Sequence, residues 1–175
     1  MKISTDPLLA RVQVAADVAL LVCSGALVPH TGFVFGLSTG SKFHNAPKKD
    51  SAKTLLKKIV SSETPCHVCA KGALITSHIL RFNQYKIDEL IQMNLGARRH
   101  ELPEFSTKMM AEIEVLFEGK VHWWNGDLFS QEETAKLIPF AEEINSKLTE
   151  RNRLLYIMGL IVQSGGRKVF LEPTE

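Results

Sequence analysis

Apolar side chains recur at helical spacing along most of this chain. In residues 51–60, apolar positions fall at 52, 55, 56, 59 and 60, which places them on one face of a helix. Similar stripes, combined with capping signals, predict about seven helices. They are expected over residues 7–27, 51–60, 65–82, 86–95, 105–118, 131–148 and 151–163.

Local signals indicate where several of these helices begin and end. Asp6 followed by Pro7 is typical of a cap with proline in the first turn, and Thr64 with Pro65 repeats the pattern. Ser130 with Glu133 forms a capping box, and a glycine follows residues 105–118 as a terminator. Residues 151–163 are apolar nearly all round, so we expect that helix to be buried.

Two short segments read as strands rather than helices. Phenylalanine and valine stand between glycines in residues 33–38, and two glycines precede residues 167–171, RKVFL. We expect these segments to pair, with residues 41–50 as a polar loop. The chain of 175 residues is therefore predicted to be one compact domain, 1–175, that is mainly α with a minor two-stranded β element, α+β at most.

Composition narrows the class of protein. With 45% apolar and 23% charged residues, the chain is typical of a globular domain, and a net charge of +2 argues against a general nucleic-acid coat. The apolar run at residues 18–28 is too short to span a membrane, which takes about 20 residues. Three cysteines without framework spacing favour a reducing compartment, so we expect a cytoplasmic protein.

The stretch TPCHVCAKGALITSHILRFN, residues 64–83, raises the question of thiol chemistry. Cys66 and Cys69 have the spacing of half a zinc site, but no second cysteine pair follows, and His78 would lie roughly 13 Å along the helix from Cys69. A redox pair in the first helical turn is the other chemical interpretation. Either would make the protein a thiol or zinc protein.

A core role accounts for the same cysteines more simply. Small side chains repeat at helical spacing and would let another element approach closely; they are Cys69, Gly72, Ala73 and Thr76. We therefore expect no metal and no cofactor, with Cys66 and Cys69 as the alternative ligands if a metal binds.

The run Cys-x-Val-Cys-Ala-x-Gly-Ala-Leu at residues 66–74 resembles a segment of uncharacterised small proteins of bacteria and their phages. Residues 110–118, MAEIEVLFE, and the final stretch RLLYIMGLIVQSGGRKVFLEP are similar to pieces of the same proteins. The resemblance implies a small cytoplasmic protein carried by mobile elements. It brings no activity and no catalytic residue.

Charge is distributed unevenly along the chain. Residues 41–60 hold six lysines against one aspartate: Lys42, Lys48, Lys49, Lys53, Lys57 and Lys58. Ten acidic residues against two lysines follow in residues 101–118 and 127–143. The pattern is explained either by ordinary solvated faces or by a bipolar surface that docks a partner of opposite charge.

Function is therefore predicted as non-enzymatic protein binding, with a phage- or mobile-element-encoded inhibitor of a host defence system, such as an anti-CRISPR protein, as its specific form. Six residues are expected to bind the partner: Lys48, Lys49, Lys53, Lys57, Trp123 and Trp124. The first alternative is a nucleic-acid or nucleotide binder using the lysine-rich segment 42–58, and the second is the thiol or zinc protein. We expect no membrane partner.

Overall fold

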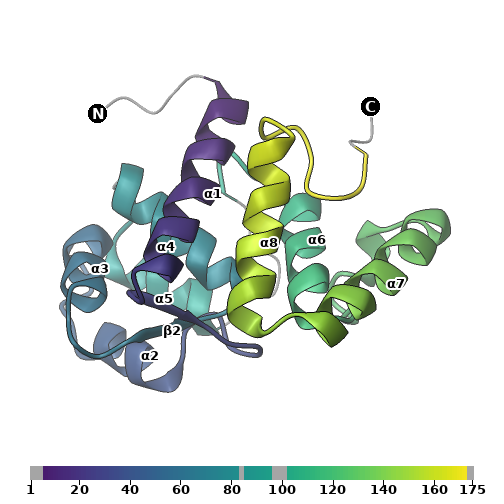
Figure 1. Ribbon diagram of the computed structural model, residues 1–175. Helices are drawn as coiled ribbons and strands as arrows, with labels where there is room; N and C mark the ends of the chain where they lie inside the picture. Colours follow the sequence, from purple (N-terminus) through teal and green to yellow (C-terminus); the bar gives the residue numbers. More distant parts are fainter. Residues whose placement is uncertain (1–5, 83–84, 96–101, 173–175) are drawn as a thin grey trace.

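Eight α-helices and a two-stranded parallel sheet make up the described part of the chain, residues 6–82, 85–95 and 102–172 of a computed structural model (Figure 1). The helices are α1 (Pro7–Cys23), α2 (Leu37–His44), α3 (Ala52–Val60), α4 (Ala70–Phe82), α5 (Ile87–Leu95), α6 (Thr107–Glu118), α7 (Gln131–Lys147) and α8 (Glu150–Gln163). A short 3-10 helix, η1 (Gly126–Leu128), precedes α7. The predicted fold class, mainly helical with a minor sheet, is confirmed.

Helix ends that depend on local chemistry lie where the sequence predicts them. The Asp6 carboxylate accepts a hydrogen bond from the Leu8 amide and caps α1. Ser130 and Glu133 form the reciprocal capping box of α7. Gly119 ends α6 in the left-handed conformation, with φ of 77°. Among the described residues, no helix is long and apolar enough to cross a membrane.

The sheet joins different segments from those predicted. Strand β1 (Leu27–Pro29) runs parallel to β2 (Cys66–Val68), with Leu27 opposite Cys66 and Pro29 opposite Val68. The predicted pairing of residues 33–38 with 167–171 is wrong. Phe35 forms only an isolated bridge with Val68, and residues 167–171 are not a strand because their amides are bound by a carboxylate of α6.

Helix α2 occupies residues that were predicted as the end of a strand and the beginning of a loop. Its sequence contains glycine, serine and threonine, which are weak helix formers. The helix is instead stabilised by tertiary packing. The buried Phe43 ring meets the buried Phe35 ring edge-on at a centroid distance of 4.9 Å. Local pattern therefore could not identify this helix.

Helix α4 is the centre of the core. Every residue from Ala70 to Ile79 is buried, whereas α8, predicted to be the buried helix, exposes Tyr156 and Val162. The predicted helix start at residue 65 is also wrong, because residues 66–68 are extended in β2. Helix α4 has no room for a larger residue at Gly72, since an added Cβ would lie 1.9 Å from the Val34 carbonyl oxygen.

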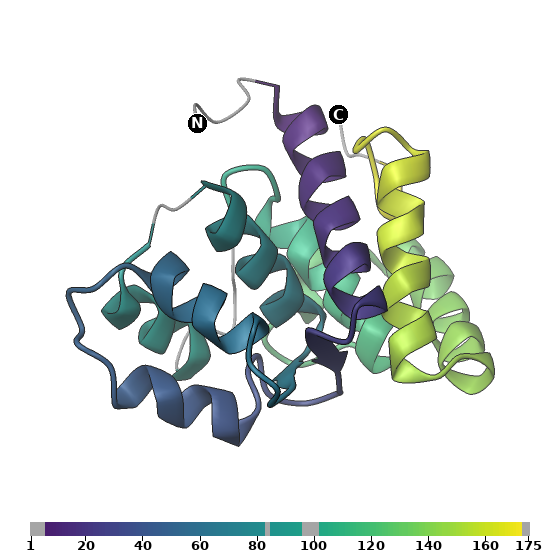
Figure 2. The same cartoon turned by 60° about the vertical axis from the view of Figure 1, so that its left-hand side comes forward.

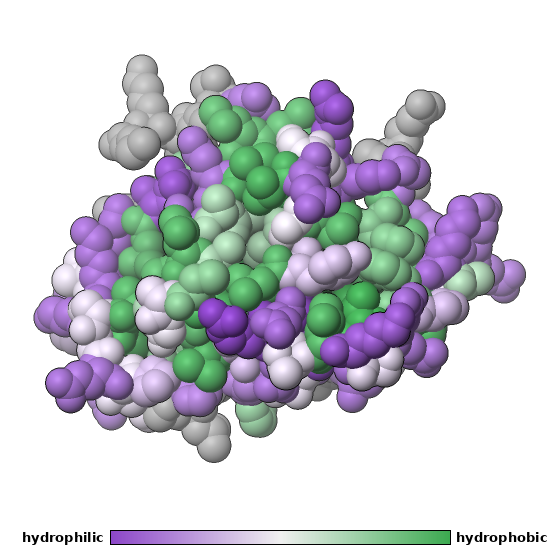
Figure 3. Space-filling model, in the orientation of Figure 1, coloured by the Kyte–Doolittle hydropathy of each residue, from purple (hydrophilic) through white to green (hydrophobic). Residues whose placement is uncertain are grey.

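Helices α1 and α8 pack side by side and antiparallel, as both cartoon views show (Figure 1 and Figure 2). Their buried faces contribute Val14 and Val18 from α1 and Ile157 and Ile161 from α8. Figure 3 shows apolar side chains gathered over the outer face of this pair. The exposed large apolar residues of the two helices are Leu9, Leu20, Tyr156 and Val162.

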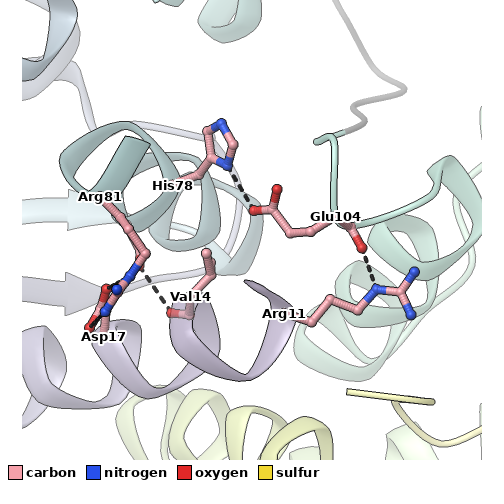
Figure 4. Close-up of polar contacts among 7 residues, drawn as sticks. Arg11, Val14, Asp17, His78, Arg81 and Glu104 are labelled. Carbon is pink, nitrogen blue, oxygen red and sulfur yellow. Dashed lines mark hydrogen bonds and ion pairs between the residues drawn. The ribbon is translucent and has the colours of Figure 1, made fainter. Parts of the chain in front are cut away.

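Buried and partly buried polar contacts connect α1, α4 and the segment before α6 (Figure 4). His78 Nδ1 lies 2.8 Å from Glu104 Oε1, and both side chains are buried. Arg81 makes a two-pronged ion pair with Asp17, with N–O distances of 2.7 and 2.9 Å. Arg11 donates to the Glu104 carbonyl. These contacts give His78 a structural role distant from the two cysteines.

Candidate protein-binding surface

The loop after α6 holds the two tryptophans in different environments. The Trp123 side chain is 78% exposed, whereas Trp124 is half-buried. Tryptophan is strongly enriched among the residues that dominate binding energy at protein interfaces. Trp123 is thus the candidate anchor of the pair, and Trp124 supports it.

The loop that carries the two tryptophans is hydrogen-bonded to a carboxylate of α6. Glu114 Oε2 accepts hydrogen bonds from Trp124 Nε1 at 3.3 Å and from Asn125 Nδ2 at 2.9 Å. The same oxygen lies 2.9 Å from Lys71 Nζ, in an ion pair whose side chains are only 4% and 13% exposed. Since Lys71 belongs to the first turn of α4, the loop is connected directly to the core helix.

The aromatic rings within this loop also pack against one another. His122 stacks on Trp124 with a centroid distance of 4.1 Å and an interplanar angle of 9°. The Trp123 ring meets Trp124 nearly perpendicularly, at 5.7 Å and 80°. Asn125 Oδ1 accepts the His122 amide at 2.9 Å, and burial lowers the pKa of His122. Burial thus favours the neutral form of the imidazole that lies against the indole of Trp124.

A second exposed aromatic residue is attached to the next turn of α6. The Phe33 side chain is 63% exposed, and the preceding Gly32 amide donates to Glu118 Oε1 at 3.0 Å. Glu118 lies one helical turn beyond Glu114, which holds the tryptophan loop. Both aromatic loops are thus anchored at the C-terminal end of α6. We call Phe33 and Trp123, with the loops 31–34 and 120–125 that carry them, the aromatic end.

Hydrogen bonds and close packing also fix the loop that carries Phe33. The Thr31 amide and hydroxyl donate to Glu150 Oε1 of α8, at 2.9 and 3.1 Å. The Val34 carbonyl accepts the Cys69 amide at 3.2 Å and lies against Gly72. The chain on either side of Phe33 is consequently held by both α4 and α8.

The predicted lysines form a separate surface. Lys48 and Lys49 lie in the turn between α2 and α3, while Lys53 and Lys57 lie on α3. Lys53 is half-buried and the other three are exposed; within the described residues none of them makes an ion pair. With Lys42 and Lys58 these residues make up what we call the lysine end.

The two predicted groups of site residues do not come together. Helix α3 contacts α4 and α5, whereas α7, which follows the tryptophan loop, contacts α6 and α8. Helices α3 and α7 lie on opposite sides of the molecule in both cartoon views (Figure 1 and Figure 2). The six predicted partner-binding residues therefore belong to two surfaces.

Both cysteines of the CxxC spacing are core residues. Cys66 lies in β2 rather than in a first helical turn, and Cys69 directly precedes α4. Burial raises the pKa of each thiol to about 11, the opposite of the shift that thiol catalysis requires. In the ranges the structure describes, no three His, Cys, Asp or Glu side chains are grouped so that they could hold a metal ion.

Three residues that form or support the aromatic end were not predicted as site residues: Phe33, Lys71 and Glu114. Lys71 could have been noticed in the sequence, because it is the only charged residue among the apolar and small residues 68–77. A lysine in such a position indicates a buried ion pair, although the sequence does not show its partner.

Comparison with known proteins gives no relative from which a function could be transferred. No protein-family model, no curated protein and no solved structure matches this chain.

Proposed function

We propose that this protein is a non-enzymatic protein-binding module that docks its partner through the aromatic end. The observation that carries the proposal is that the exposed Trp123 stands on a loop whose neighbouring side chains are hydrogen-bonded to Glu114. An indole that is 78% exposed is held by a loop whose polar side chains are tied to a nearly buried ion pair.

Such a support favours binding for a thermodynamic reason. A partner that covers an interface residue must offset the entropy lost when that residue and its loop become ordered, at roughly 0.5–1.5 kcal/mol per immobilised side chain. Here Trp123 already packs on Trp124, and the loop is hydrogen-bonded to Glu114. Most of the energy gained by burying the indole is therefore available for affinity.

Phe33 extends the surface that a partner could cover. Two exposed aromatic residues on loops attached to consecutive turns of one helix provide a wider apolar area than a single side chain. Protein interfaces commonly combine such aromatic centres with a polar rim. Lys120, exposed at the end of α6, and the exposed Asp127 provide polar groups close by in the chain.

The lysine end adds a long-range electrostatic contribution in this proposal. Its cations lie on the side of the molecule opposite α7, whose Glu132, Glu133 and Glu143 each pair with a lysine. Charges outside the central contact change the association rate more than the dissociation rate. The Phe43 ring, which could have stacked on a base beside these lysines, is fully buried, and this favours a protein partner over a nucleic acid.

Affinity capture with matched variants tests the proposal. The wild type, Trp123→Ala and Tyr156→Ala would each be immobilised and exposed to a nuclease-treated lysate of the source organism, and bound proteins quantified by mass spectrometry. Tyr156 is the control, since it is another exposed aromatic residue but lies on α8. We expect a protein that is retained by the wild type and by Tyr156→Ala and is lost with Trp123→Ala.

The affinity for the captured protein then gives the energetic contribution of the indole. Trp123→Ala should weaken binding by roughly 30-fold or more, the equivalent of about 2 kcal/mol. If no captured protein distinguishes Trp123→Ala from Tyr156→Ala, the aromatic end is not the docking surface. The narrower hypothesis of an inhibitor of a host defence complex is supported by the sequence resemblance alone, and the identity of the captured protein tests it.

A further inference from the structure

A cavity of about 460 Å³ lies at the end of α6 that is opposite to the aromatic end. Its walls come from α1, from the first turns of α6 and from the segment after α8; they are lined by Arg11, Ser106, Lys108, Met109, Glu112, Arg167, Lys168, Val169, Leu171 and Glu172. A second hollow of the same volume, around residues 102–106, shares Arg11 and Ser106 with it. The volume falls within the range of pockets that hold small metabolites, about 300–1,000 Å³.

Neither arginine of the cavity makes an ion pair with a carboxylate of the described residues. Arg11 donates Nη1 to the Gly166 carbonyl at 3.0 Å and Nε to the Glu104 carbonyl, and both acceptors are uncharged. A guanidinium has five N–H donors, so three remain for another acceptor. Arg167 is exposed and has no ion pair among the described residues. Two cations with unused donors therefore line one cavity.

The remaining charges of the cavity are already matched. Lys108 pairs with Glu133 at 2.6 Å, and Lys168 pairs with Glu172. Glu112 Oε1 accepts the amides of Phe170 and Leu171 at 2.7 and 2.6 Å, which ties the segment after α8 to α6. Burial raises the pKa of Glu112 to about 7, so this carboxyl is only partly charged at neutral pH. The cavity consequently has an excess of positive charge.

We propose that this cavity binds a small phosphate-bearing ligand, with Arg11 and Arg167 as the groups that hold its phosphate. Guanidinium groups match phosphate oxygens in paired hydrogen bonds. Donors on separate elements, the two arginines and the Ser106 hydroxyl, suit the three free oxygens of a phosphate better than the two oxygens of a carboxylate. The site is distinct from the proposed protein-binding surface, which lies beyond the other end of α6.

Titration with inorganic phosphate, followed by amide NMR shifts at constant ionic strength, tests this site. Saturable shifts are expected at residues 106–112 and 167–171, without shifts at residues 121–125. Arg167→Gln should raise the Kd at least tenfold; because Arg167 is exposed, this variant should fold normally. Arg11→Lys, which keeps the charge but not the paired donors, should raise it about fivefold or more.

Matched controls separate a built site from general charge attraction. Lys57→Gln removes an exposed cation from α3 and should leave the phosphate Kd unchanged, as should Trp123→Ala. Acetate should bind at least tenfold more weakly than phosphate. Shifts that do not saturate, an Arg167→Gln variant that binds like the wild type, or acetate that binds as well as phosphate would each overturn the proposal.

Discussion

The aromatic end and the lysine end show two ways in which a small helical protein can present a surface. At the aromatic end, exposed rings stand on loops that are hydrogen-bonded to the carboxylates of Glu114 and Glu118. At the lysine end, charged side chains extend from a turn and from α3 without ion pairs among the described residues. The loops of the first surface are hydrogen-bonded to the rest of the protein, whereas most lysine side chains of the second surface are exposed to solvent.

This difference separates two contributions to binding. Ordered apolar groups lose little entropy when they are covered, so they contribute to affinity and slow dissociation. Solvated charges must give up hydration and side-chain freedom on direct contact, and they act mainly on the rate of encounter. A substitution beneath the aromatic end should therefore affect folding and binding together, whereas one at the lysine end should affect association alone.

The largest effect is expected where the support of the tryptophan loop is broken. Glu114→Leu leaves the buried Lys71 cation without its carboxylate, and removal of one partner from a buried pair typically costs about 3–5 kcal/mol. Urea unfolding followed by tryptophan fluorescence measures the loss. Lys71→Met combined with Glu114→Leu should recover part of the stability, since no charge is then left buried, although Asn125 Nδ2 still lacks its acceptor. A loss below about 1 kcal/mol in the single variant would show that the pair does not support this end.

A comparable loss of stability is expected if a side chain is added at Gly72, where α4 packs against the loop that carries Phe33. At Gly72 a methyl group would lie 1.9 Å from the Val34 carbonyl oxygen, so Gly72→Ala must displace backbone and should cost about 3 kcal/mol. Gly159→Ala is the matched control within α8, because nothing lies within 4 Å of its added Cβ. There the better helix former should raise stability by about 0.5–1 kcal/mol, again read from urea unfolding.

A smaller effect on the free energy of unfolding, dependent on pH, is expected from the Glu112 carboxyl of α6, which differs from Glu114 in its partners. Glu114 has a lysine partner, whereas Glu112 is held by backbone amides, and burial raises its pKa from 4.5 to about 7. The folded state then keeps a proton that the unfolded chain has released, so stability should fall as pH rises from about 4.5 to 7. The slope attributable to this group is at most about 1.4 kcal/mol per pH unit.

Glu112→Gln should remove that slope, because an amide oxygen accepts the same two amides without titrating. Thermal unfolding of both proteins between pH 4 and pH 8 gives the difference directly. Curves that stay parallel through this window would mean that folding does not raise the pKa of Glu112.

The smallest effect on stability is expected at the lysine end. Replacing Lys48, Lys49, Lys53 and Lys57 by glutamate should change unfolding free energy by less than about 1 kcal/mol, since surface substitutions usually have small effects. Association with the partner should slow about tenfold at low salt while dissociation stays nearly constant, as surface plasmon resonance would show. If the wild type instead binds random duplex DNA with a log–log salt slope of about −0.9 per contact, the nucleic-acid interpretation replaces the protein partner.

Sequence patterns correctly predicted several helices whose ends depend on residues close by in the sequence. The caps at Asp6, Ser130 and Gly119 are local hydrogen-bonding or backbone preferences, so a short window of sequence contains the whole cause. Helix α2 and the sheet depend on contacts between distant segments. Strands of three residues, such as β1 and β2, are too short to show the alternation that identifies a strand.

The candidate site was predictable only in part, for the same reason. The tryptophan pair could be recognised in the sequence as an interface candidate. Because both residues are tryptophans and adjacent, the sequence does not show that Trp123 is exposed while Trp124 is hydrogen-bonded to Glu114; that difference comes from tertiary contacts. The support depends on Glu114 and Lys71, which belong to different helices. The cysteines were correctly predicted as core residues, because cysteine among small apolar residues is typical of a close-packed interior.

The packing of α1 against α8 has a consequence for synthesis of the chain on the ribosome. Among the helices of the described residues, α1 is translated first, yet α8, which packs along it, is translated last. At 5–20 residues per second, the intervening segment takes on the order of 10 s to appear. During that interval the apolar face of α1 lacks its native cover, so nascent chains should depend on chaperone binding until α8 has been completed.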